Sequence, residues 1–183
     1  MMKSILICAA IVAVAASLVW AQQPARKQPL SPPAETSVTI AGKALTIKYS
    51  APSVRGRKIF GEGGRVSQDP TYPVWRAGAN AATAFHTDAD LRIKNLTVPK
   101  GDYTIYVLVN APQWQLIISK QTGQSGMTYN QNQDLGRIPM DMSQPPALIE
   151  TCKMTLSATG TNAGKLQLEW ENTIASVPIT VKE

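Results

Sequence analysis

The sequence predicts an all-β protein, folded as an antiparallel two-sheet β-sandwich, with a barrel or jelly-roll arrangement as a variant of the same class. Three observations lead to this prediction. From Thr36 onward, apolar residues alternate with polar ones in short runs. Turn-forming Gly, Pro and Asn residues separate these runs. No segment has a sustained helical period with capping residues, so packed sheets must supply the core.

Residues 1–21 have the features of a cleavable signal peptide. Lys3 supplies a positive charge, residues 5–19 are almost wholly apolar, and Val19-Trp20-Ala21 has the form of a cleavage site. The apolar run is shorter than the ~20 residues that a membrane span needs. We therefore expect export to the periplasm or the extracellular space, and no membrane span after cleavage. An uncleaved N-terminal anchor is the alternative.

The next segment, residues 22–35, has four prolines and no aromatic side chain, which predicts a flexible tether. Residues 36–183 are then expected to form a single β-sandwich domain. Signal cleavage takes away one of 18 basic residues and none of 12 acidic ones, which leaves a charge of +5. This mild basicity suits an anionic small molecule or an envelope polyanion, but it lacks the dense basic stripe of a nucleic-acid-binding protein.

Within the domain, Ala41-Gly42-Lys43 predicts the turn of a first hairpin, and 110–113 the turn of a second. Pro178 cannot donate a backbone hydrogen bond, so its run is expected to be an edge strand. The expected strands lie near 36–40, 45–50, 84–91, 103–109, 114–118, 152–156, 166–170 and 177–181.

Two segments, 50–78 and 121–146, do not have the pattern of plain strands. The first is rich in Gly, Pro and Arg, and the second in Gly, Gln, Asn and Pro. Long loops within a small domain are often functional. These two segments are therefore where a site is expected.

Five stretches of the sequence form a recognisable set: 49–61 (YSAPSVRGRKIFG), 74–80 (VWRAGAN), 99–103 (PKGDY), 114–118 (WQLII) and 166–170 (LQLEW). Together they resemble a known family, the bacterial exported proteins grouped as DUF2911. The resemblance implies export and one β-rich domain, but no established activity, so no catalytic residue can be carried over from it. The chain departs from the family pattern in a longer connection at 62–73, and in Ser125-Gly126 where a Trp-Gly pair is common.

A basic cluster in the first loop segment is the leading site candidate. Arginine presents a planar fork of donors that matches carboxylate and phosphate, while Trp75 adds an apolar face and Asn80 adds a donor and an acceptor. The alternative is structural: the arginines tie the loop to carbonyls and carboxylates, and Trp75 belongs to the core. We expect this tying role for Arg76 and solvent exposure for Arg55 and Lys58. The predicted ligand-binding residues are Arg55, Arg57, Lys58, Trp75, Arg76 and Asn80, with Arg65 in the same cluster.

His86 and Cys152 are the other residues with reactive side chains in the mature chain. His86 and Asp88 share one strand face, but no second His or Cys pair accompanies them, so we predict no metal, no cofactor and no catalytic residue. Cys152 alternates in phase with Met154 and Leu156, which predicts a buried, unreactive thiol.

These observations favour a non-enzymatic cell-envelope module that binds a small anionic or sugar-like ligand. A structural or protein-interaction domain without a small-molecule site is the alternative. A hydrolase-type enzyme comes third, because no paired carboxylate, Cys/His or Ser/His arrangement has a recognisable spacing.

Overall fold

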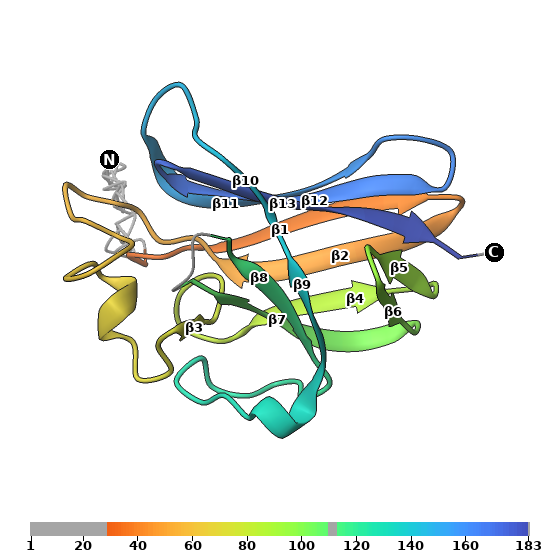
Figure 1. Cartoon of the computed structure of the whole chain (residues 1–183), viewed down its shortest axis with the longest axis horizontal. Helices are drawn as coiled ribbons and strands as arrows, with labels where there is room; N and C mark the ends of the chain where they lie inside the picture. The colour runs from red at the N-terminus through yellow and green to blue at the C-terminus, as the bar shows by residue number, and fades with distance from the viewer. Residues whose placement is uncertain (1–28, 110–112, 183) are drawn as a thin grey trace, which may run out of the picture.

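The computed structural model describes residues 29–109 and 113–182, whose strands form two antiparallel sheets packed face to face (Figure 1). The predicted two-sheet sandwich is confirmed, and neither sheet closes into a barrel. The predicted signal peptide and residues 110–112 of the second predicted turn lie outside the described residues. No helix within the described part of the chain is long and apolar enough to cross a membrane.

The first sheet has seven strands in the order β1-β2-β4-β7-β8-β9, with β3 paired to β7. Its β1–β2 hairpin turns at Ala41 and Gly42, whose φ angles of 49° and 71° are those of the two-residue turn that the sequence predicted. The bounds are β1 Pro33–Ile40, β2 Lys43–Ser50, β3 Val74–Trp75, β4 Thr83–Thr87, β7 Gly101–Leu108, β8 Gln115–Ser119 and β9 Asp134–Pro139.

The second sheet has six strands in the order β11-β12-β13-β5-β6, with β10 paired to β13. The bounds are β5 Leu91–Ile93, β6 Leu96–Val98, β10 Asp141–Ser143, β11 Ile149–Ala158, β12 Ala163–Glu171 and β13 Thr173–Val181. Two short 3₁₀ turns, η1 Val66–Gln68 and η2 Gln131–Gln133, are the helical elements of the described residues.

The strand predictions need three corrections. Strand β1 begins at Pro33, within the predicted tether. The single strand expected at 84–91 is two strands in different sheets, because Thr87 Oγ1 donates to Ala89 O at 2.8 Å and holds a sharp turn between them. The 121–146 segment contains β9 and β10, whose pairing with β8 and β13 depends on tertiary contacts and not on local alternation.

The edge-strand prediction for Pro178 is wrong, because β13 lies inside the second sheet. Val181 N donates to Asn162 O on the β12 side, so by alternation the nitrogen of Pro178 points to the other side of β13. On that side β10 pairs only with residues 174–176 and β5 only with residues 180–181. Proline therefore occupies a gap where no neighbouring strand needs its N–H.

The inner faces of the two sheets share one core. Alternating residues of β2, β4, β7 and β8 meet those of β11, β12 and β13 in a single buried cluster. At one end this core is closed by the 51–80 loops, drawn in yellow in Figure 1. Representative members are Leu45, Ile47, Phe85, Ile105, Leu116, Met154, Leu168 and Val177.

Candidate functional site

The first arginine-bearing turn is fixed to the end of β11. Val54 N donates to Glu150 O at 2.7 Å, and the backbone N–H of Arg55 donates to a carboxylate oxygen of Glu150 at 2.8 Å. Arg55 and Gly56 have φ angles of 51° and 69°, which reverse the chain. The turn therefore has a defined place on the second sheet although its arginine side chains are exposed.

After this turn the chain runs inward and joins the core. Ile59 is fully buried. The ring of Phe60 lies edge-on to the rings of Trp75, Trp114 and Trp170, at centroid distances of 5.6, 4.6 and 5.7 Å. Such aromatic contacts anchor the loop, so the basic residues on either side of Phe60 are held in fixed positions.

Trp75 is a core residue, as the structural interpretation expected. It is 1% exposed and stacks on Trp170 with a centroid distance of 5.6 Å. Its indole N–H donates to Gly78 O at 3.0 Å. Because it ends the short strand β3, its neighbour Arg76 begins the loop directly at the edge of the core.

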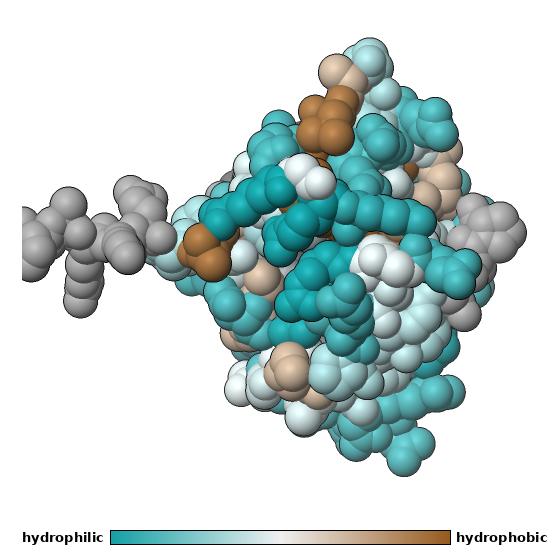
Figure 2. Space-filling model, turned by 90° about the vertical axis from the view of Figure 1, so that its left-hand side faces the viewer, coloured by the Kyte–Doolittle hydropathy of each residue, from teal (hydrophilic) through white to brown (hydrophobic). Residues whose placement is uncertain are grey.

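A pocket of about 570 Å³ opens at this end of the sandwich. Figure 2 views this end, where hydrophilic side chains cover most of the centre and a few hydrophobic ones stand among them. Asp69 is the one acidic residue in the described lining. The basic and polar residues that line the pocket include Arg55, Arg57, Arg65, Arg76 and Asn80.

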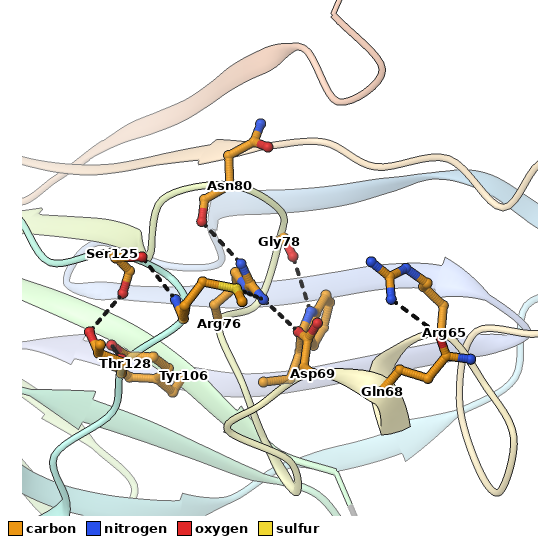
Figure 3. A network of polar contacts seen from close by, with 11 residues as sticks. Arg65, Gln68, Asp69, Arg76, Gly78, Asn80, Tyr106, Ser125 and Thr128 are labelled. Carbon is orange, nitrogen blue, oxygen red and sulfur yellow. Dashed lines mark hydrogen bonds and ion pairs between the residues drawn. The ribbon is translucent and has the colours of Figure 1, made fainter.

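Arg76 is the buried centre of the polar network in Figure 3, with 7% of its surface exposed. Its Nη2 lies 2.9 Å from an oxygen of Asp69, and Nη1 donates to Asn80 O at 3.1 Å. The sulfur of Met127 lies 3.5 Å from Nη2. Nε is buried and has no hydrogen-bond partner among the described residues. Arg76 therefore ties three segments together, as expected, and still holds one unused buried donor.

The other three pocket arginines are exposed and only partly engaged. Arg55 Nη2 donates to Leu30 O at 2.9 Å, and Arg65 Nη1 contacts Gln68 at 3.3 Å. Arg57 donates from Nε and Nη2 to two backbone carbonyls, at 3.0 and 2.7 Å. A guanidinium carries five N–H groups, so within the described residues each of these side chains keeps at least three for other partners.

Lys58 and Asn80 differ from what the sequence suggested. The Lys58 ammonium is exposed as expected, but it donates to Glu62 O at 2.7 Å and is not part of the pocket lining. Asn80 lines the pocket, and its main-chain carbonyl accepts from Arg76. Its side-chain amide faces Ser31 O at 3.5 Å. The structure thus brings together five of the six predicted residues and leaves out Lys58.

The 121–146 segment, where the sequence predicted a site without naming residues, lines the pocket through Met127. Gly126 packs so closely on Arg76 and on the carbonyl of Asn80 that a Cβ would collide with both. The segment is held by Tyr106, whose hydroxyl donates to Thr128 O at 3.0 Å (Figure 3). The signal in the sequence was the Ser125-Gly126 pair, which had marked a departure from the family pattern but not a contact with Arg76.

His86 lies elsewhere, on the outer face of the first sheet beside a second pocket of about 680 Å³. Its Nδ1 lies 2.7 Å from Asp102, directly opposite on β7, and its Nε2 lies 3.0 Å from Asp88. Hydrogen bonds to Asp88 and then to Asp102 raise the pKa of His86. The two carboxylates bind opposite nitrogens of the ring, and the described residues contain no group of three ligands that could hold a metal ion.

Cys152 is 1% exposed, in phase with Met154 on the inner face of β11. Burial raises the pKa of its thiol to about 12. The predicted burial is confirmed, and its chemical inertness is a prediction taken up below.

Residues 31–179 match the family described as a protein of unknown function, DUF2911. The chain belongs to this family. The DUF2911 match spans both sheets and begins at Ser31, which lines the arginine pocket. No curated protein and no solved structure matches the chain.

Proposed function

We propose that this DUF2911 domain is an exported, non-enzymatic module that binds a small organic anion in the arginine pocket. One observation carries the proposal: among the described residues, four arginines and a single acid line one pocket. Arg76, the most buried of them, fixes the surrounding loops through Asp69 and Asn80. A pocket of this size suits a small ligand, and guanidinium groups recognise carboxylate or phosphate through paired hydrogen bonds.

One further observation supports a binding role. His86 and Cys152, the histidine and the cysteine of the described residues, lie on the outer sheet face and in the core, away from this pocket. Export rests on the signal-like segment 1–21. N-terminal sequencing of the secreted protein should give a start near Gln22, and an intact Met1 in the mature protein would contradict the export proposal.

The binding test is calorimetric titration of the protein with phosphate, citrate, glucuronate and benzoate. At least one should bind, and Arg65→Ala should weaken that binding roughly 10-fold or more, as loss of a charge-assisted hydrogen bond predicts. Arg92→Ala is the matched control, because Arg92 is an exposed arginine on β5 with one bond to a carbonyl, Lys94 O at 3.1 Å. Binding should also weaken as salt rises.

The competing function, a structural or protein-interaction domain, draws on a specific observation of its own. Arg55, Arg57 and Arg76 all donate to backbone carbonyls. If this tying role is the whole role, no anion in the panel will bind, and Arg65→Ala will behave like Arg92→Ala in every titration.

A further inference from the structure

The arginine pocket offers more hydrogen-bond donors than hydrogen-bond acceptors. Within the described residues, Arg55, Arg57 and Arg65 each keep at least three unused N–H groups. The lining acceptors are fewer: Asp69 is paired with Arg76 and Gln68 Oε1 accepts from Arg65, which leaves mainly the side-chain oxygens of Asn80 and Ser31. A neutral sugar presents hydroxyl groups that need acceptors as well as donors. The imbalance selects a ligand head that only accepts, which is an oxyanion.

The indoles in the pocket lining offer no polar atom to a ligand. Trp75 Nε1 donates to Gly78 O at 3.0 Å, and Trp170 Nε1 lies 3.4 Å from Glu150 O. Both rings are also almost fully buried, at 1% and 2% exposed, so they leave little surface for a ligand. The apolar surface that a ligand could contact must therefore come from other lining residues.

Two exposed apolar side chains line the same pocket. The described residues expose four large hydrophobic side chains, and two of these, Leu30 at 71% and Met127 at 51%, line the arginine pocket. They come from segments that lie far apart in the sequence. Leu30 is fixed through its carbonyl, which accepts from Arg55, and Met127 through its sulfur, which faces Arg76. Exposed apolar groups gathered at a pocket are typical of a binding surface.

We infer that the ligand is an organic oxyanion with an apolar body, such as a medium-chain carboxylate or phosphate monoester. The anionic head binds the arginines, and the apolar body lies against Leu30 and Met127. This inference rests on the proposed function and names the ligand class of the same pocket. It also selects a single molecule over a membrane surface, because the arginines line a pocket of about 570 Å³, a volume that suits a small ligand.

The test is a titration of the exported protein with straight-chain carboxylates from acetate to octanoate, and with hexyl phosphate beside hexanoate. Affinity should rise about two- to fourfold with each methylene, since full burial of a methylene gives the upper figure. Leu30→Ser and Met127→Gln should flatten this dependence, so that each added methylene raises the affinity less than it does in the wild type. Leu148→Ser is the matched control, because Leu148 is 53% exposed and outside the pocket lining.

Three results of this titration would contradict the inference, and they differ in what they say about the proposed function. Binding that needs Arg65 but ignores chain length would overturn the apolar-body inference and leave the proposed function standing. Absence of binding by every acid and phosphate would overturn both. Binding to vesicles of anionic phospholipid, with no binding of the soluble acids, would also overturn the inference in favour of a membrane surface.

Discussion

Replacement of Arg76 by methionine removes a buried cation and leaves two acceptors behind. The side chain of Asp69 is only 14% exposed, and its carboxylate would lose the guanidinium 2.9 Å away. The carbonyl of Asn80 would lose a donor at 3.1 Å. Removing one partner of a fully buried pair costs about 3–5 kcal/mol. Since Asp69 keeps some contact with water, we expect a loss of about 3 kcal/mol in the free energy of unfolding.

The measurement is urea unfolding followed by tryptophan fluorescence, because Trp75 and Trp170 are buried beside the substituted residue. For a domain of this size such a loss lowers Tm by about 6–12 °C. Arg92→Met is the control, and as an exposed substitution it should stay within about 0.5 kcal/mol of the wild type.

A double-mutant cycle isolates the ion pair from the rest of the change. In the Asp69→Asn background, Arg76→Met should cost less than it does alone, because the orphaned charge is already gone. Stability of the single Arg76→Met protein within about 0.5 kcal/mol of the wild type would refute the tying role derived from the geometry.

Three further outcomes are expected. Cys152 should not react with a thiol reagent in the folded protein, since burial raises its pKa to about 12, and rapid native labelling would contradict the structure. The raised pKa of His86 means that its protonated form stabilises the fold below about pH 6.5 and that this contribution is lost as pH rises through the raised value. The stability difference between wild type and His86→Gln should therefore shrink from pH 5.5 to pH 9, and Asp102→Asn should lower the pKa of His86 measured by NMR. Exhaustive chelation should leave Tm unchanged, and a large drop would show a metal that the described residues do not reveal.

Local patterns predicted the fold class because alternation and turn chemistry are local properties. The turn at Ala41 and Gly42 needs positive φ angles at neighbouring positions, and it fixes the β1–β2 register by itself. Alternation does not tell which sheet a strand joins, so the crossing between Thr87 and Leu91 was missed. For the same reason Pro178 was assigned to an edge, although the gap beside β13 accommodates it.

Only part of the pocket lining could be predicted from the sequence, for a related reason. Arg55, Arg57 and Arg76 lie close together in sequence, so their clustering is visible there. Leu30 and Met127 come from segments far apart in the chain, and only the packing of the 51–80 loops against both brings them to the pocket. In the sequence, the residues next to Leu30 and Met127 do not indicate that either side chain belongs to a site.

The two roles weighed for the arginines, ligand contact and loop tie, are compatible in physical terms. Arg57 uses Nε and Nη2 to hold two carbonyls, and these bonds orient the remaining N–H groups of the same rigid plane. A guanidinium already held in place loses less side-chain entropy when it contacts an anion than a mobile one does. Bonds to the main chain therefore do not count against binding. What separates the hypotheses is whether an oxyanion finds the donors that those bonds leave unused, and Arg65, the pocket arginine with the fewest such bonds, is the residue whose loss tests this with least disturbance of the fold.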